Sequence, residues 1–150
     1  MKRKESPINY FKAEFPSNSV NESFSRGICA SFLSFLDPAV SELCDVRTAV
    51  SEAVTNSIVH GYKDRPGIVY ISGACYPDGR IIIRIKDKGC GIPDVRTAME
   101  PLYTTDKSGD RAGMGFAIMK AFSDKLKVSS RPGKGTTVTL TKRIVKNGRE

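Results

Sequence analysis

The chain has 150 residues, of which 39% are hydrophobic and 27% charged, a composition typical of one soluble globular domain. No apolar stretch approaches the ~20 residues that cross a bilayer, and the first residues contain no signal-peptide core. We therefore expect a cytoplasmic protein without membrane contact. The four cysteines contain no Cys-x-x-Cys pair, and with a single histidine this argues against a zinc site.

The net charge of +8 raises the question of nucleic-acid binding. Much of the excess lies at the two ends, in residues 1–4 and 142–149, where basic residues usually form solvated tails. No motif that interleaves aromatic and basic residues accompanies it. We therefore expect no direct contact with nucleic acid.

The N-terminal third predicts a strand and then a helix. Residues 8–15 are rich in aromatic residues and predict a strand that ends at Pro16. Ser19, with Glu22 three residues later, predicts a capping box for a helix that ends near Leu36. The apolar side of this helix is expected to carry Phe24, Ile28, Phe32 and Phe35.

A second helix is predicted from Asp37, as the N-cap, and Pro38, in the first turn, to a stop at Gly61. Its apolar residues recur every three or four positions, as a core-facing stripe requires. They are Leu43, Val46, Val50, Val54 and Ile58.

The rest of the chain predicts more strands and short helices. Residues 68–75 and 80–86 are expected to form an antiparallel hairpin around the turn Pro77-Asp-Gly79. A short helix near 95–100 precedes a polar lid at 101–112. A helix from about Gly115 leads to two final strands at 125–130 and 136–142, and a basic tail at 143–150 ends the chain. Without a repeat or linker, residues 1–150 predict one two-layer α/β domain whose sheet is mainly antiparallel.

The segment Glu52-Ala-Val-Thr-Asn56 offers the first chemistry. Glu52 and Asn56 are four residues apart on the second helix, so they share a face that His60 continues. Beside a magnesium-bound triphosphate, a carboxylate can accept the proton of an attacking hydroxyl. An amide oxygen can ligate Mg²⁺ without adding charge, and Mg²⁺ needs few protein ligands.

The segment Asp87-Lys-Gly-Cys-Gly91 offers the second. Asp87 ends a hydrophobic strand, and its carboxylate can accept a hydrogen bond from an adenine amino group, where guanine presents a carbonyl. Gly89 and Gly91 allow a close turn beneath the base. Taken alone, this pattern is equally typical of an ordinary turn.

The segment Gly113-Met-Gly115 opens an apolar helix, whose free N–H groups favour phosphate oxygens. Lys107 and Arg111, just before it, can add charge. The spacing fits neither a Walker A loop nor a Rossmann fingerprint.

Together, Val50–Tyr62, Asp87–Pro93 and Gly113–Met119 resemble the N, G1 and G2 boxes of the ATPase superfamily that includes gyrase, Hsp90, histidine kinases and MutL. The similarity is closer still to the sporulation anti-sigma F factors, which are serine protein kinases, and it covers nearly the whole chain. It implies a Bergerat-type, histidine-kinase-like ATPase fold, with a mixed, mainly antiparallel sheet covered by helices on one face.

The resemblance also implies a role for each matching residue. Glu52 is the catalytic base, Asn56 the magnesium ligand, Asp87 the adenine-reading residue, and Arg26 a contact to partner proteins. The remaining nucleotide contacts are Gly89, Gly91, Thr104, Thr105, Arg111, Gly113, Met114, Gly115 and Thr137, of which Thr104 and Thr105 belong to the lid and Thr137 to the adenine side.

For function, the resemblance implies an anti-sigma factor that binds and silences sporulation sigma factor F. With MgATP, it also phosphorylates a serine of an anti-anti-sigma factor, and it acts as a homodimer. Bound ADP in place of ATP is expected to shift its choice between the two partners. Two alternatives stay open. One is the kinase that antagonises the general-stress sigma factor B, and the other is a nucleotide-gated sigma-binding module with little kinase activity.

Overall fold

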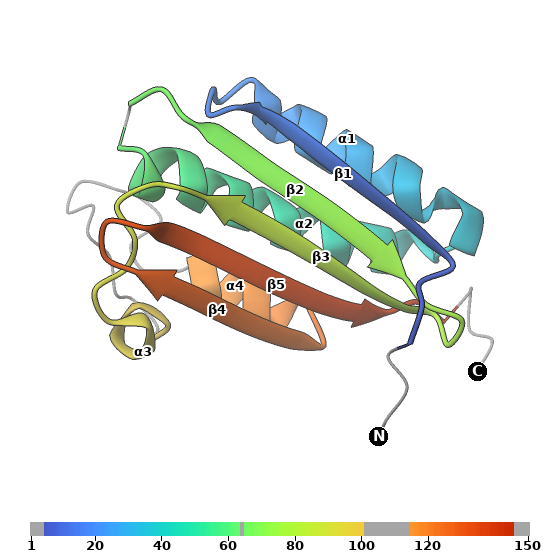
Figure 1. Ribbon diagram of the computed structural model, residues 1–150. Helices are drawn as coiled ribbons and strands as arrows, with labels where there is room; N and C mark the ends of the chain where they lie inside the picture. Colours follow the sequence, from blue (N-terminus) through green and yellow to red (C-terminus); the bar gives the residue numbers. More distant parts are fainter. Residues whose placement is uncertain (1–4, 64, 101–114, 146–150) are drawn as a thin grey trace.

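Alternation of apolar and polar residues builds a five-stranded sheet in this computed structural model, which describes residues 5–63, 65–100 and 115–145 (Figure 1). In β3, for example, Ile81, Ile83 and Ile85 are buried while Arg84 and Lys86 are exposed. The strands are β1 (Asn9–Pro16), β2 (Ile68–Cys75), β3 (Arg80–Asp87), β4 (Lys125–Arg131) and β5 (Gly135–Arg143).

The strand order is β1-β2-β3-β5-β4, and all four pairings between neighbouring strands are antiparallel. The predicted hairpin is confirmed, because β2 and β3 pair around a turn in which Gly79 has a φ of 86°. The expectation of a mainly antiparallel sheet is confirmed, and no parallel pairing occurs among the described strands. In the sheet, β5 lies between β3 and β4, although β4 comes before β5 in sequence. With this order, every pair of neighbouring strands is antiparallel.

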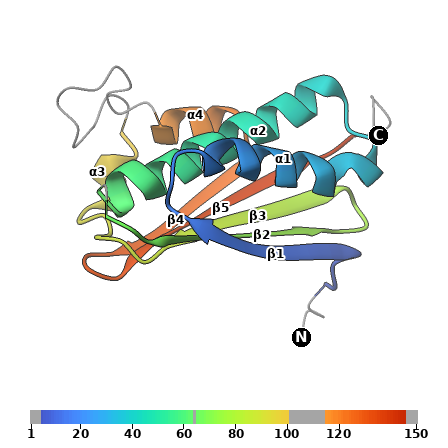
Figure 2. The same cartoon turned by 90° about the horizontal axis from the view of Figure 1, so that it is seen from above.

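The long helices cover one face of the sheet, and the other face is open in the described part of the chain (Figure 2). The predicted two-layer arrangement is therefore confirmed. The helical elements are α1 (Asn21–Leu33), the 3-10 turn η1 (Ser34–Leu36), α2 (Val40–Thr55), the π-helix η2 (Asn56–Gly61), α3 (Val95–Ala98) and α4 (Gly115–Ala121).

The core lies between α1, α2, α4 and the sheet. The predicted α2 stripe is confirmed for Val46, Val50, Val54 and Ile58, all of which are buried. From α4, Met119 is fully buried. Because α2 packs on both α1 and α4, it is the central helix, and residues near its C-terminal end are held firmly.

The predicted apolar side of α1 is partly wrong. Phe24 and Phe35 are each about half exposed, whereas Cys29 and Leu33 face the core with no exposed surface. Phe35 instead packs on Phe32, with ring centroids 6.4 Å apart, and Phe24 leans toward the sheet edge. Phe24 contacts Phe15 of β1, with ring centroids 5.8 Å apart. Since aromatic rings reach further than aliphatic side chains, they can cover β1 from the flank of the helix.

Both predicted helix caps are wrong. The N-cap of α1 is Val20, and no side chain caps it. For α2, the N-cap is Ala39, whose N–H donates to the Glu42 carboxylate over 2.8 Å. Asp37 lies two residues earlier in the left-handed region, with a φ of 51°, and ends η1. The chain therefore needs an extra turn between the helices, which displaces the start of α2.

Candidate active site

The catalytic candidates of the first motif lie where α2 changes into the π-helix η2. Glu52, in the last turn of α2, is only 5% exposed, and Asn56 begins η2. π-Helical turns are rare in proteins, and many of those that occur lie at functional sites. Glu52 is thus a buried carboxylate and not part of a solvated helix face.

Asp87, at the end of β3, is a second buried carboxylate, with 3% of its surface exposed. Burial raises its pKa above the ordinary value of 3.8, and hydrogen bonds from the Gly89 N–H, the Ser57 hydroxyl and the Thr136 N–H lower it in part. The Gly89 N–H lies 3.0 Å from Oδ1. The strand edge therefore holds a carboxylate that is poorly solvated and has accepting capacity left.

Two glycines bring the first and second motifs into contact. A Cβ on Gly61 would lie 3.0 Å from the Asp87 carboxylate, and a Cβ on Gly89 would lie 2.2 Å from the Gly61 carbonyl oxygen. That same carbonyl accepts the Cys90 N–H over 2.8 Å. Because backbone meets backbone here, only glycine fits at position 89. The predicted turn at the G1-like motif is thus locked onto the end of η2.

The other end of this turn rests on the β4–β5 hairpin. Gly91 has a φ of 75°, and a Cβ there would lie 2.0 Å from the Arg131 carbonyl oxygen. The Cys90 carbonyl accepts the Gly133 N–H over 2.6 Å, and the Ser130 hydroxyl accepts the Ile92 N–H over 2.7 Å. The loop after Asp87 is therefore held between η2 and the hairpin.

The third motif reaches the same place from α4. A Cβ on Gly115 would lie 3.1 Å from Oδ1 of Asn56, so the start of α4 lies against the Asn56 amide. Segments 59 residues apart thus meet at one end of α2. The other predicted contacts of this region, Thr104, Thr105, Arg111, Gly113 and Met114, lie outside the described residues, as does the predicted lid at 101–112.

Thr137 is not placed as predicted. It lies opposite Lys86 in the β3–β5 ladder, and side chains of neighbouring strand residues point to opposite faces. The buried Thr136 is the residue that lies opposite Asp87, and its N–H bonds the Asp87 carboxylate. Thr137 therefore belongs to the open face, and Thr136 shares the helix-covered face with Asp87. The sequence missed this because the motif Gly135-Thr-Thr137 does not show which threonine points inward.

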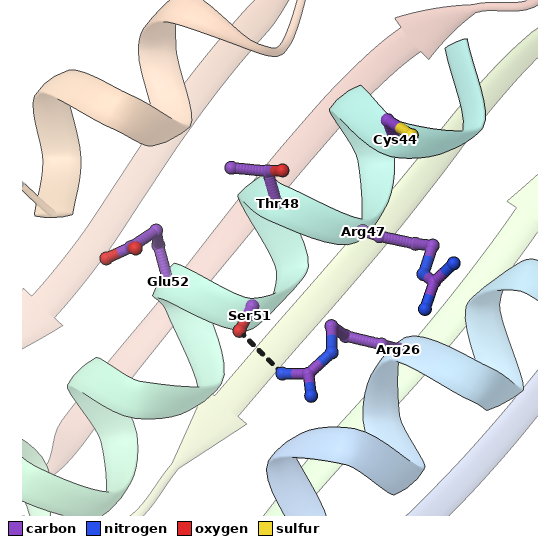
Figure 3. Close-up of a pocket in the computed structure, with 6 residues that line it drawn as sticks. All are labelled: Arg26, Cys44, Arg47, Thr48, Ser51 and Glu52. Atoms are coloured by element: carbon purple, nitrogen blue, oxygen red, sulfur yellow. Dashed lines mark hydrogen bonds between the residues drawn. The ribbon is translucent and has the colours of Figure 1, made fainter. Parts of the chain in front are cut away.

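Arg26 lies on α1 and reaches across to α2, where it donates to the Ser51 hydroxyl over 3.0 Å (Figure 3). The two helices form an open pocket of about 350 Å³ at this point. Arg26 and Arg47 approach it from opposite helices, and Glu52 projects from α2 away from Arg26 (Figure 3). The lining residues are Arg26, Cys44, Arg47, Thr48, Ser51 and Glu52.

Sequence reasoning missed two supporting residues. The Ser57 hydroxyl donates to Asp87 from η2, next to Asn56. The Tyr62 hydroxyl donates to the Ile68 carbonyl and accepts the Lys88 N–H, which ties the end of η2 to the residue after Asp87. Ser57 directly follows the predicted ligand, which was an available signal, whereas nothing local in the sequence pairs Tyr62 with Lys88.

The groups at this site fit an adenine nucleotide. Asp87 is a hydrogen-bond acceptor, and the described ion pairs do not include it. Gly61 packs directly against its carboxylate, and Gly89 packs against Gly61. Among the described residues, no three His, Cys, Asp or Glu side chains gather as metal ligands. Within the same residues, no helix has both the length and the hydropathy to cross a membrane.

Comparison with known proteins agrees with this geometry. The profile of the family described as histidine kinase-like ATPase domain matches residues 24–142. An anti-sigma F factor of Caldanaerobacter subterraneus subsp. tengcongensis is 50% identical over 139 residues, which cover 93% of this chain and 96% of the relative. The chain belongs to the anti-sigma F factor family of histidine kinase-like ATPase domains. Membership of an ATPase family implies that the site binds nucleotide.

Other members and solved structures extend the comparison. An anti-sigma F factor of Geobacillus kaustophilus is 47% identical over 140 residues, or 93% of this chain and 95% of the relative. A Mycobacterium tuberculosis structure that contains the RsbU and RsbW domains of Rv1364c matches 93% of this chain and 33% of that one, with 21% identity and a TM-score of 0.67. At this identity the structural match supports the family fold alone.

Proposed function

We propose that this protein is an anti-sigma factor and an ATP-dependent serine protein kinase. It binds and inhibits the sporulation sigma factor F, and it phosphorylates a serine on an anti-anti-sigma factor, which inactivates that factor. The observation that carries the proposal is the meeting of three motifs at the end of α2. Gly61 packs against Asp87, and Asn56 packs against Gly115.

The proposed mechanism assigns a task to each residue. Asp87 accepts a hydrogen bond from the adenine amino group, and the glycine turn after it approaches the base closely. Asn56 holds Mg²⁺, and the start of α4 with the residues before it contacts phosphate oxygens. When bound, MgATP supplies the phosphoryl group and the cation that neutralises its charge.

Glu52 is the proposed general base. Its carboxylate accepts the proton of the substrate serine hydroxyl as that oxygen attacks, so it must be ionised when the substrate is bound. Transfer to a serine is favoured over hydrolysis when the bound partner protein excludes water from the pocket that Glu52 lines. Arg26 lines the same pocket as Glu52, so a partner protein that contacts Arg26 lies next to the catalytic base.

Sigma factor F is favoured over the general-stress sigma factor B as the partner. The relatives with the printed name anti-sigma F factor match more than nine-tenths of this chain at 47–50% identity. The RsbW-containing structure shares 21% identity. A homodimer is part of the proposal by resemblance to the family. Strand β1 is at the sheet edge, and the exposed Phe24 of α1 offers apolar surface for it.

Substitution separates the kinase from the binding module. With labelled MgATP and the anti-anti-sigma protein, Glu52→Gln should reduce transfer to serine by about 10²- to 10⁴-fold, since one general base contributes that much. Its capture of sigma factor F should stay within about twofold of wild type. Wild-type transfer with the Gln variant would show that Glu52 is not the base.

Arg26→Ala should weaken capture of both partners by about 10- to 100-fold, the value of one lost charged hydrogen bond. The matched control is Arg96→Ala, because Arg96 is exposed on α3, away from the pocket. Equal capture by both variants would remove Arg26 from the partner surface. A different outcome would favour the sequestering module. In it, the wild-type protein binds ATP and captures sigma factor F but transfers no phosphate to the anti-anti-sigma protein.

A further inference from the structure

The open face of the sheet collects positive charge. Seven basic side chains of the strands lie at positions on this face and are exposed, and we call them the basic face: Lys12, Arg84, Lys86, Lys125, Lys127, Arg131 and Arg143. The acidic side chain on the same strand face is Glu14 of β1. The described ion pairs, Arg80 with Glu5 and Lys142 with Asp45, do not involve the basic face. The excess charge of the chain is therefore not confined to its ends.

The register arranges these charges in a row. Lys12 lies opposite Ser72, Ser72 opposite Arg84, Arg84 opposite Thr139, and Thr139 opposite Lys127. Neighbouring strands are about 4.8 Å apart, so the backbone positions of the three basic residues follow one another at about 10 Å. Hydroxyl groups fill the places between them. The row crosses the whole sheet and presents hydrogen-bond donors along its length.

Tyrosines lie on both sides of this row. Tyr10 belongs to the neighbouring row that contains Lys125, and Tyr70 to the one that contains Lys86. Tyr10 is 67% exposed, and the Lys88 ammonium lies 5.1 Å from the centre of the Tyr70 ring. Flat sheets that combine basic side chains with exposed aromatic rings suit single-stranded nucleic acids, whose bases stack on the rings and whose phosphates meet the cations.

We propose that the basic face binds single-stranded nucleic acid through its phosphates, on the side of the sheet opposite to the nucleotide site. From the sequence alone, we assigned much of the positive charge to the two ends and expected no nucleic-acid contact. The sequence did not show which basic strand residues share one face of the sheet. An acidic protein is a weaker fit, because the exposed Tyr10 ring can stack on a base, and a carboxylate offers no ring for that contact. The proposal does not depend on kinase activity.

The test is fluorescence anisotropy of a labelled 20-nucleotide single-stranded RNA against the full chain, over a range of salt concentrations. The test variant is Arg84→Gln with Lys127→Gln. The matched control is Arg96→Gln with Lys120→Gln, which removes the same charge from exposed positions on the helices and keeps both tails. Each lost phosphate contact should reduce the magnitude of the slope of log affinity against log salt concentration by about 0.7.

We expect the test variant to bind at least tenfold more weakly than wild type at 100 mM salt, with a slope smaller by about 1.4. The control should stay within about twofold. Equal losses in both variants would overturn the proposal, because net charge or the tails would then account for binding. Equally strong binding of a polyglutamate peptide of matched charge, or tighter binding of a 20-base-pair duplex, would also overturn it, in favour of an acidic protein or a duplex.

Discussion

At the scale of the residue, the burial of the Asp87 carboxylate lowers the stability of the fold when the group is ionised. Because its folded-state pKa is raised by burial, the protonated form is the one that the fold favours. The stability that this preference gives is fully present below the ordinary value of 3.8 and is lost as pH rises through the folded-state pKa. Above that folded-state pKa the ionised carboxylate therefore destabilises the nucleotide-free protein.

Asp87→Asn should remove this conflict. Without nucleotide, the free energy of unfolding of the variant should rise relative to wild type as pH increases from about 3.5 to 7, because the amide does not ionise. Urea unfolding at several pH values measures it. The same variant should bind ATP about 10- to 100-fold more weakly, the value of one hydrogen bond to a charged group. A difference between the proteins that does not change with pH would contradict the assigned cause.

At the scale of the element, the loop after Asp87 depends on glycine where two segments of backbone meet. Gly91→Ala should destabilise the fold and reduce ATP affinity, because its Cβ would lie 2.0 Å from the Arg131 carbonyl oxygen and its φ is 75°. The chain supplies a matched control. Gly133 has the same φ, but a Cβ there meets nothing within 4 Å.

Gly133→Ala should cost only the strain of the left-handed conformation, about 1–2 kcal/mol, and should leave ATP affinity unchanged. Gly91→Ala should cost clearly more in urea unfolding and should lose measurable ATP affinity. If the two substitutions had equal effects on stability and on binding, the close approach of this loop to the β4–β5 hairpin would not matter for the site.

The elements also show how far the sequence could predict the structure. The hairpin, the α2 stripe and the final strands followed from periodicity and turn residues, which act locally. The helix caps did not, because the left-handed Asp37 and the extra turn at η1 depend on how α1 and α2 pack.

In the site, Glu52, Asn56 and Asp87 could be named from motif spacing. The π-helical form of η2 and the inward position of Thr136, by contrast, come from tertiary contacts. The same holds for the link from Tyr62 to Lys88, since residues 26 apart in sequence meet only in the folded chain. Local patterns therefore identified the motif residues, and packing determined which neighbours support them.

At the scale of the whole molecule, the two proposed sites lie on different faces of the sheet. The helix-covered face holds the residues proposed to bind nucleotide, at one end of α2, and the Arg26 pocket between α1 and α2. The open face carries the basic row. Because a five-stranded sheet separates them, a partner on Arg26 and a nucleic acid on the basic face can be bound together, and neither covers the other's surface.

The most direct test of the kinase and anti-sigma account is a single-turnover reaction of the wild-type protein with labelled MgATP and the anti-anti-sigma protein. Mass spectrometry and nucleotide analysis follow the γ-phosphate. We predict one phosphate on one serine of the partner, formed as fast as ADP appears. The reaction starts from a complex that contains the partner protein and ATP. Release of ADP and free phosphate from this complex without a phosphorylated partner would contradict the account and make the protein an ATPase.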